Sequence, residues 1–437
     1  MTDLLAARSQ MAMSLGFHIV FAAIGIAMPL MMTIAEWRWI RTGQPSYLTL
    51  AKRWAKGVAI LFAIGAVSGT VLSFELGLLW PHFMEWAGPI IGPLFALEGF
   101  AFFTEAIFLG IYLYGWSHLP PKLHVATGAI VAVSGVASAI AVVAANAWMN
   151  TPSGFQLLDG LPRDIQPWTI MTNPHAWDEC VHMILAAFAA TGFLVAGIHS
   201  FMLLRFGPSQ FHEQALGIAL LVGGIPALLQ PLSGDLLTKA VAKHQPAKLA
   251  AVEALFRTTQ GAAFHLGGVP DVNTGTVPYS LEIPKALSLL LYLDPDALVT
   301  GLDRIPRRDW PPVAVVHIAF QVMVGLGVAL AALTLWAWWL WWRRPPLPNH
   351  VWLLRSLVLA APFGMFAIEA GWVVTEVGRQ PWIIYGIMRT AEAVTPMPGI
   401  AVPFILFTIL YVLLALVVVW TLWRHVAATG QMKEKSY

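Results

Sequence analysis

Five side chains that can bind a metal or carry a proton stand within long apolar runs or at the start of one: His18, Glu98, His182, Met323 and Glu369. A polar or charged group in hydrocarbon costs several kcal/mol unless it is paired or ligated. Counted from the predicted ends of their runs, most of these residues fall in the outer half of a bilayer. A shared polar or metal site is therefore the first hypothesis for them.

The ligand types narrow this hypothesis to haem. Imidazole is a good axial ligand for haem iron, and a thioether opposite it raises the reduction potential. His182 with Met323 would suit a six-coordinate electron-transfer haem. The other three side chains, His18, Glu98 and Glu369, would suit haems with weaker or open coordination. Other metal centres fit less well, since the sequence holds no Glu-x-x-His or His-Glu-x-x-His helix motif.

Each of these residues also has an ordinary structural interpretation. A single membrane histidine would equally hydrogen-bond a neighbouring helix. Met323 is one of 16 methionines, and a lone methionine is more often packing than ligand. Glu98 and Glu105, seven residues apart on nearly one helix face, would serve as a proton path, an ion site or a structural pair. His199 is interpreted as a packing or helix-bonding residue, and His317 is left open.

The composition requires membrane helices to position these groups. Of 437 residues, 58% are hydrophobic and 11% charged, and the mean hydropathy is +0.70, far from the balance of a soluble domain. The sole cysteine, Cys180, excludes an intrachain disulfide, and no Cys-x-x-Cys-His attaches haem covalently. The first apolar run lacks a basic n-region and should remain a helix. Runs of spanning length fall at 15–37, 57–80, 92–115, 124–148, 183–205, 214–234, 313–342, 352–374 and 403–424.

About nine transmembrane helices follow, and charge predicts their direction. One set of connections holds few basic residues, among several acidic ones: Arg8, Arg163, Arg379 and Arg389. The other set is rich in basic residues: Arg38, Arg41, Lys52, Arg53, Lys56, Lys122, Arg205, Arg343, Arg344, Arg355, Arg424, Lys433 and Lys435. The positive-inside rule therefore places the N-terminus outside and the C-terminus in the cytoplasm. The net charge of +2 points to no nucleic-acid partner, and none is expected.

Three regions result: helices 1–6 in residues 1–234, an external loop domain in 235–312, and helices 7–9 with a cytoplasmic tail in 313–437. A long ordered loop of this kind usually has a function. Its sequence predicts an amphipathic helix at Pro246–Thr259.

Several stretches together resemble one known family. They are Gln10–His18, Ala96–Gly99, Asn146–Met149, Lys248–Glu253, Glu369–Trp372 and Gly378–Trp382. In this order they resemble subunit I of cytochrome bd-type quinol oxidases, and Gly-Arg-Gln-Pro-Trp is the most specific of them. The resemblance covers helices 1–9, and the short loop before helix 7 matches the short Q-loop type. The implied fold is an all-α integral membrane protein whose bundles enclose haems.

The resemblance implies a quinol:oxygen oxidoreductase with three haems and no copper. His182 and Met323 would ligate a low-spin haem b. His18 and Glu369 would each ligate a high-spin haem, one a haem b and the other a haem d or a third haem b, in an order left open. Glu98 would contact a haem or donate a proton, and Glu105 and Ser138 would form part of a proton route. Lys248 and Glu253 would bind quinol. The residues next to haem propionates or haem edges would be Arg8, Asn146, Trp372 and Arg379.

The implied mechanism separates charge without a pump. Quinol would be oxidised at the external loop, releasing its protons outside, while O2 is reduced to water with cytoplasmic protons. The family also implies a homologous subunit II and allows a small single-helix accessory subunit, in a bacterial inner membrane. One departure is Gln321, two residues before the ligand methionine, where the family often has an arginine. An arginine there would help hold the charge of the low-spin haem, so the departure bears on the reduction potential of that haem and not on its ligation.

Four rival interpretations make distinguishable predictions. A secondary transporter would be colourless. A haem-copper oxidase needs a denser set of histidines, and a dihaem cytochrome b needs histidine pairs on two helices; neither pattern occurs. A family member that had lost quinol oxidation would not need Lys248 and Glu253, which are both present.

Overall fold

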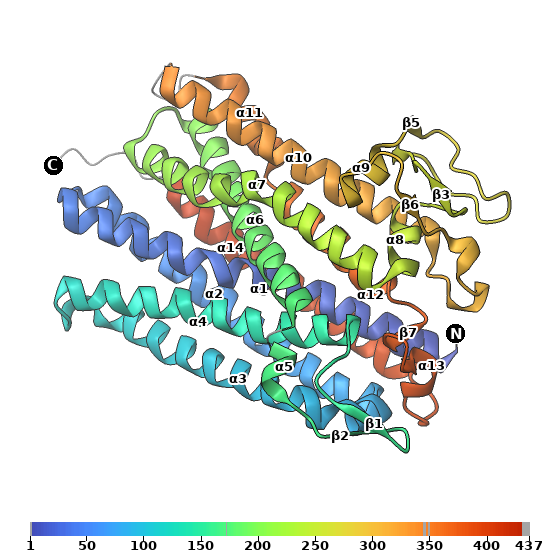
Figure 1. Cartoon of the computed structure of the whole chain (residues 1–437). Helices are drawn as coiled ribbons and strands as arrows, with labels where there is room; N and C mark the ends of the chain where they lie inside the picture. The colour runs from blue at the N-terminus through green and yellow to red at the C-terminus, as the bar shows by residue number, and fades with distance from the viewer. Residues whose placement is uncertain (1, 172, 344–346, 348–349, 431–437) are drawn as a thin grey trace.

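The computed structural model describes residues 2–171, 173–343, 347 and 350–430. Within them, nine helical segments are long and apolar enough to cross a membrane, as the sequence predicts. They run side by side, and the N-terminus lies at the opposite end of the molecule from the last helix's C-terminal end (Figure 1). Of the charges used for orientation, Arg344, Lys433 and Lys435 lie outside the described residues. The long helices are α1 (Asp3–Thr42), α2 (Pro45–Leu79), α3 (Pro81–Tyr114), α4 (Pro121–Asn150), α6 (Pro174–Phe206), α7 (Gln210–His244), α10 (Val313–Arg343), α11 (Val351–Ala360) with α12 (Phe363–Val377), and α14 (Ala401–Gly430).

The helices continue beyond the apolar runs that predict them. The Thr2 hydroxyl accepts the Leu5 N–H at 3.3 Å and caps α1 at its start, since a cap satisfies a donor that has no partner in the first turn. His18 therefore lies about four turns into α1, deeper than its place near the start of the predicted run 15–37 indicates. α7 likewise continues past residue 234, where the external loop was predicted to begin, and ends at His244. Among the helices that carry candidate ligands, α10 begins at the predicted Val313, so Met323 keeps its predicted depth.

The eighth span, predicted at 352–374, is present at Val351–Val377, and it is broken near its middle. α11 ends at Ala360 and α12 begins at Phe363, with Pro362 between them. Proline lacks an N–H and its ring clashes with the preceding turn, so it breaks the hydrogen-bond ladder. The break gives α12, which carries Glu369, a direction of its own.

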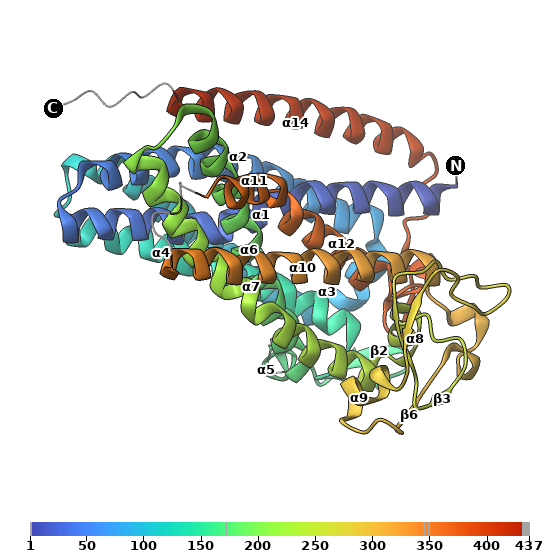
Figure 2. The ribbon, with the colours of Figure 1, turned by 90° about the horizontal axis from the view of Figure 1, so that it is seen from above.

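Helices that are neighbours in sequence pack as antiparallel pairs: α1 with α2, α3 with α4, and α6 with α7. α1 also contacts α4, α6 and α14, and α12 contacts α10 and α6. Figure 2 shows α14 along one flank of the bundle. Its side chains there, such as Ile409, Leu416 and Trp420, are largely exposed. Exposed apolar faces of this size suit lipid or another membrane subunit.

The non-helical pieces gather largely at the end of the molecule that holds the N-terminus (Figure 1). The predicted helix Pro246–Thr259 is wrong beyond Val252: α8 stops there, because Ala254 adopts a left-handed φ of 50° that no continuing helix allows. The smaller elements described are η1 (Gly115–Ser117), β1 (Gln156–Leu158) paired with β2 (Leu161–Arg163), α5 (Pro167–Met171), α8 (Pro246–Val252), β3 (Thr259–Gln260) paired with β6 (Leu298–Val299), β4 (Phe264–Leu266) paired with β5 (Leu281–Ile283), α9 (Ala286–Tyr292), η2 (Leu302–Arg304), η3 (Arg307–Asp309), β7 (Trp382–Ile384) paired with β8 (Met388–Arg389), and α13 (Thr390–Ala393).

Candidate functional site

His18 on α1 is held by a serine on α2. Its Nδ1 lies 2.9 Å from the Ser68 hydroxyl, which itself donates to the Ile64 carbonyl at 2.9 Å. A serine has one hydrogen to donate, so the Ser68 oxygen accepts from the ring Nδ1–H. Nε2 then carries the lone pair, which is the form of imidazole that binds a metal.

His182 on α6 repeats this arrangement with a serine on α7. Its Nδ1 lies 2.9 Å from the Ser233 hydroxyl, and that hydroxyl donates to the Gln230 carbonyl at 3.0 Å. The Gln230 amide donates to Nε2 at 3.1 Å, which again requires a lone pair there. Both histidines thus present Nε2 as a metal ligand would.

Each of the four candidate ligands faces a glycine on a neighbouring helix at close range. A Cβ at the glycine would lie 3.0 to 3.4 Å from an atom of the ligand side chain, tighter than ordinary packing. Glycine is thus the residue that leaves each ligand its room. The pairs are Gly69 with His18 Cε1, Gly371 with Met323 Sδ, Gly16 with Glu369 Oε2 and Gly234 with His182 Cε1.

Several buried polar atoms on α12, the helix that carries Glu369, and just after it have no protein partner in the described part of the chain. Among the described residues, Glu369 Oε1, Trp372 Nε1, and Arg379 Nε and Nη1 are buried and make no hydrogen bond. Arg379 is only 2% exposed, and its one ion pair runs from Nη2 to Glu376 at 2.5 Å. A buried guanidinium with free N–H groups leaves a desolvation cost that an anionic ligand would offset. The donor set therefore fits haem iron, and Arg379 fits a propionate. Arg8 is half-buried on α1.

The predicted proton-route residues meet between α3 and α4. The Ser138 hydroxyl donates to Glu98 Oε1 at 3.4 Å. Glu105 is buried, and a Cβ at Gly135 would lie 3.5 Å from its Oε2. α3 therefore presents both carboxyl groups to one face of α4, as the seven-residue spacing predicts.

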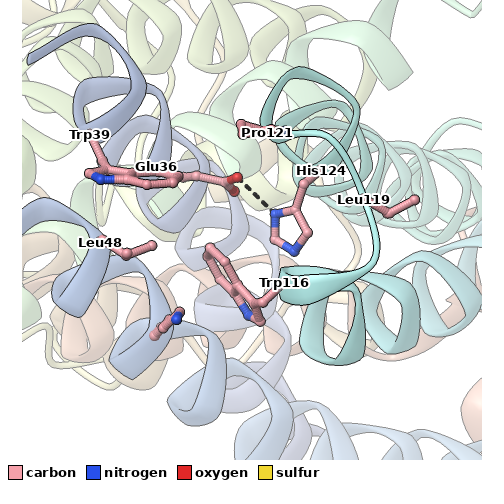
Figure 3. Close-up of a pocket in the computed structure, with 8 residues that line it drawn as sticks. Glu36, Trp39, Leu48, Trp116, Leu119, Pro121 and His124 are labelled. Atoms are coloured by element: carbon pink, nitrogen blue, oxygen red, sulfur yellow. Dashed lines mark hydrogen bonds and ion pairs between the residues drawn. The ribbon is translucent and has the colours of Figure 1, made fainter. Parts of the chain in front are cut away.

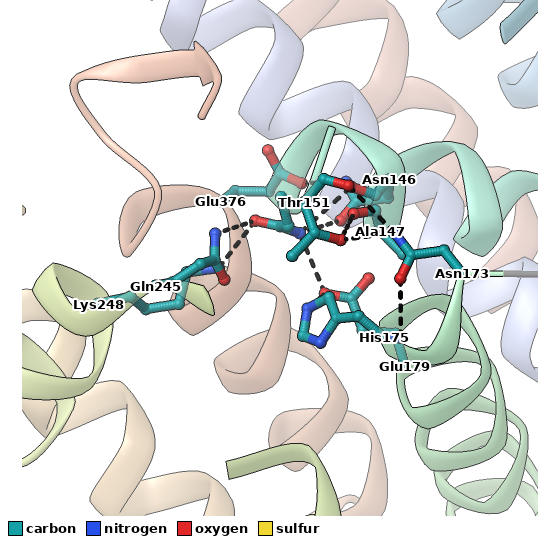
Figure 4. Close-up of polar contacts among 10 residues, drawn as sticks. Asn146, Ala147, Thr151, Asn173, His175, Glu179, Gln245, Lys248 and Glu376 are labelled. Atoms are coloured by element: carbon teal, nitrogen blue, oxygen red, sulfur yellow. Dashed lines mark hydrogen bonds and ion pairs between the residues drawn. The ribbon is translucent and has the colours of Figure 1, made fainter. Parts of the chain in front are cut away.

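Lys248 and Glu253 lie on and just after α8, in the loop region, and are 3% and 1% exposed. Lys248 Nζ donates to Asn150 Oδ1 at 2.8 Å (Figure 4). Burial lowers the pKa of Lys248 to about 7. Burial also raises the pKa of Glu253 to about 8, and its Oε2 has no hydrogen-bond partner among the described residues. Two groups that titrate near neutrality are suited to hold and deprotonate a bound hydroxyl group.

Comparison with known proteins shows the family to which this chain belongs. Residues 6–430 match the model of the family described as cytochrome bd terminal oxidase subunit I. The chain is a member of that family. It is 37% identical over 97% of its length to a putative cytochrome bd menaquinol oxidase subunit I of Bacillus subtilis (strain 168), of which the match covers 96%. It is 32% identical over 98% of its length to that organism's cytochrome bd ubiquinol oxidase subunit 1, of which the match covers 94%.

The fold of the chain also matches that of a solved structure. The structure of bd oxidase from Geobacillus thermodenitrificans matches with a TM-score of 0.92 and 39% identity, covering 97% of this chain and 98% of that one. The chain is therefore subunit I of a cytochrome bd quinol oxidase, a membrane-embedded terminal oxidase and oxidoreductase. Family membership implies haems and a subunit II. The transporter, haem-copper oxidase and dihaem cytochrome b interpretations are wrong.

In this cytochrome bd subunit the structure adds an amide that sequence reasoning missed. Asn150 is fully buried at the end of α4. Its Oδ1 accepts from Lys248 and, at 3.1 Å, from Gln245. Its Nδ2 donates to Glu179 at 3.0 Å and to Asn146 Oδ1 at 3.1 Å (Figure 4). The one available signal was its position four residues after Asn146, on the same helix face.

Asn146 connects this network to the buried arginine. It donates to Glu376, which also pairs with Arg379. One chain of hydrogen bonds therefore runs from the loop lysine to the guanidinium that fits a haem propionate. Glu376, like Glu179, was not singled out from the sequence, because a lone acid near a helix end is ordinarily solvated.

Two residues of α10 anchor the loop. Gln321 donates to the His265 carbonyl at 2.8 Å and accepts the Gly267 N–H at 3.0 Å. His317 lies 2.7 Å from the Val252 carbonyl through Nδ1 and 3.2 Å from the Gly267 carbonyl through Nε2. The residue that departs from the family pattern thus has a use here, which is to fix β4 and its turn. On α6, His199 contacts His212 of α7 at 2.8 Å, a helix-bonding role.

Proposed function

We propose that this subunit oxidises quinol at the outer face of the membrane and supplies O2 reduction with cytoplasmic protons, generating membrane potential without pumping. The observation that carries the proposal is Lys248, a buried lysine that titrates near neutrality and sits at one end of the molecule. Glu98 and Glu105 lie within the helices, on a line that leads toward the other end. Release and uptake of protons would then occur on opposite sides.

The quinol site is the space beside Lys248 and Glu253. The Lys248 ammonium would donate to a quinol oxygen and stabilise the negative charge that develops as the hydroxyl ionises. Glu253 in its carboxylate form would accept the proton. Oxidation of one quinol releases two electrons and two protons, and the exposed loop surface returns those protons to the outside.

The Nδ1 contacts with Ser68 and Ser233, and the glycine that faces each candidate ligand, support an assignment of the haem ligands. His182 and Met323 would hold the low-spin haem b, while His18 and Glu369 would hold the two high-spin haems, a haem b and a haem d or third haem b. Arg379, Trp372, Asn146 and Arg8 would contact propionates or ring edges. When bound, the haems would carry electrons and reduce oxygen. The protein's part is to fix the imidazole tautomers through Ser68 and Ser233 and to offset the propionate charge.

Glu105, Ser138 and Glu98 would conduct the protons that oxygen reduction consumes. Intramembrane carboxyl groups on one helix face are typical of proton relays. Ser138 would keep Glu98 oriented, and Glu105 would receive protons from the cytoplasmic side.

The positive-inside rule supports an outside N-terminus and a cytoplasmic C-terminus in a bacterial inner membrane. Residues 235–312 would then form the external quinol-binding domain, between helical regions 1–234 and 313–437. The exposed face of α14 and the outer faces of α2 and α3 offer apolar surface for subunit II and for a single-helix accessory subunit.

The proposal is tested on the purified oxidase in liposomes, with short-chain ubiquinol and menaquinol as substrates. We expect haem absorption bands on dithionite reduction, quinol-dependent O2 uptake, and acidification outside matched by alkalinisation inside. A colourless preparation, or proton uptake from the quinol-release side, would contradict it. The ratio of charges moved per electron should be one, since no proton is pumped.

A further inference from the structure

A small pocket lies at the end of the helices opposite the loop domain, where α1, α2 and α4 meet the turn η1 that follows α3. Its volume is about 70 Å³, which is room for a few water molecules. A carboxylate and an imidazole face each other at its wall (Figure 3). The pocket is lined by Glu36, Trp39, Leu48, Lys52, Trp116, Leu119, Pro121 and His124.

Glu36 and His124 hold one proton between them. Both residues are buried, at 0% and 2% exposure, and Glu36 Oε1 lies 2.8 Å from His124 Nδ1. His124 Nε2 faces the Tyr112 carbonyl at 2.9 Å, and because a carbonyl can only accept, Nε2 carries a hydrogen. The short contact at Nδ1 then requires a second hydrogen, located on either the acid or the ring.

The second carboxyl oxygen of Glu36 is left without a partner in the part of the chain that the structure describes. This oxygen, Oε2, is buried with no hydrogen bond of ordinary geometry among the described residues, and so is the Tyr112 hydroxyl. The Tyr112 ring lies against the pair, with its centre 4.5 Å from the centre of the His124 ring. Lys52 stands at the mouth with Nζ 5.1 Å from the Trp116 ring centre. The ionisable groups facing the pair are therefore Lys52 from α2 and Tyr112 from α3.

A line of polar residues leads from this pair to Glu105. On α3, Tyr112 and Glu105 are seven residues apart, hence on nearly one face and about 10 Å apart along the axis. On α4, the buried hydroxyls of Thr127 and Ser134 follow His124 at helical spacing. The two helices pack closely there: a Cβ at Gly128 would lie 2.8 Å from the Tyr112 ring.

We propose that the Glu36–His124 pair is the cytoplasmic proton-loading site of this subunit, taking protons from water in the pocket and passing them to Glu105. The inference rests on the proposed function and names the entrance to its proton route. Each transfer leaves the pair's remaining hydrogens in place: the proton between Oε1 and Nδ1 moves on toward Glu105, and water in the pocket replaces it.

The competing role is structural, because the same contact ties α1 to α4. Glu36→Gln separates the two roles: glutamine keeps the size and the hydrogen bond to His124, but it cannot exchange a proton. His199→Gln is the matched control, since it alters another buried histidine contact that joins two helices, α6 and α7, away from the line to Glu105.

The experiment uses the complete oxidase with subunit II, reduced and then mixed rapidly with O2. Proton uptake is followed with a pH-sensitive dye, and haem content and oxidation by absorbance. In Glu36→Gln we expect proton uptake at least tenfold slower with haem content unchanged, and wild-type uptake in His199→Gln. Glu36→Asp, which restores an acid, should recover part of the rate. In parallel, an infrared difference spectrum on changing pH should lose a carboxyl band in Glu36→Gln.

Wild-type uptake in Glu36→Gln would overturn the inference and leave the proposed function standing. A wild-type oxidase that takes up no cytoplasmic protons would overturn the proposed function itself. If Glu36→Gln does not assemble with haem, His124→Asn decides, because its amide can still bond Glu36 Oε1 in place of Nδ1 but cannot take up a proton; unchanged uptake in that variant would equally overturn the inference.

Discussion

Asn150→Leu should change the pH dependence of quinol oxidation by acting on Lys248. The Asn150 oxygen accepts from Lys248 Nζ at 2.8 Å inside the protein, and leucine has nearly the same shape without that oxygen. A hydrogen bond to a charged group stabilises by about 1.5–3 kcal/mol, against about 1 kcal/mol for a neutral one. The ammonium form therefore loses roughly 1–2 kcal/mol relative to the amine, or about one pKa unit.

The size of the effect follows from the starting value. Burial already lowers the pKa of Lys248 to about 7, so the substitution should lower it to about 6. At pH 7 the ammonium fraction then falls from about a half to about a tenth, since each pKa unit is a factor of ten. If the ammonium holds the quinol oxygen, the rate drops about fivefold at pH 7 and only about twofold at pH 6.

The assay is the initial rate of short-chain quinol oxidation, measured as O2 uptake by the complete oxidase between pH 5.5 and 9. Asn150→Asp should shift the profile the other way, because a carboxylate beside Lys248 favours the ammonium. Gln245→Leu is the matched control: it removes a neutral bond to the same oxygen, 3.1 Å long, and should leave the profile in place. An Asn150→Leu profile identical to wild type, or shifts of the same sign in both Asn150 variants, would refute the reasoning.

Three further predictions test the haem and quinol sites. Ser68→Ala and Ser233→Ala release the Nδ1–H groups that orient the histidines, so each should weaken haem retention about 10–100-fold, measured by haem content after dilution; full retention in both would contradict the assigned tautomers. Glu253→Gln should slow quinol oxidation by about 100-fold and abolish the rise in rate with pH on the acidic limb of the profile, which reflects ionisation of its carboxyl group; a retained rise would remove its role as base. Gly371→Ala should displace the proposed thioether ligand, 3.0 Å from the added Cβ, and lower the low-spin haem's midpoint potential, while Gly325→Ala, with open space around it, should not.

The membrane helices and the candidate ligands could be predicted from the sequence because hydrocarbon imposes strong rules. An apolar run of about 20 residues has few alternatives to a spanning helix, and a buried imidazole or carboxyl group needs a partner. The ends of the helices were less predictable. Once a helix leaves the bilayer, polar residues continue it at little cost, which is how α1 reaches back to Asp3 and α7 on to His244.

The polar networks could not be predicted, because they depend on which helices become neighbours. Glu36 and His124 are 88 residues apart, and Asn150 and Lys248 are 98 apart. Helical periodicity places each residue on a face of its own helix, but it does not say which other face it meets. Each of these four residues lies near an end of its run or in the loop, where a polar residue is ordinarily solvated.

The two networks occupy opposite ends of the bundle and solve opposite problems. At the loop end, burial moves the pKa values of a lysine and a glutamate toward neutral pH, so that a substrate hydroxyl can lose its proton there. At the other end, a carboxyl–imidazole pair beside a small pocket keeps a proton available between two heavy atoms 2.8 Å apart. Between them lie the histidines fixed by serines and the carboxyl groups of α3. If protons leave at the first network and enter at the second, the energy-conserving step needs no moving part: it requires only that the route past Glu105 stays closed to the quinol site.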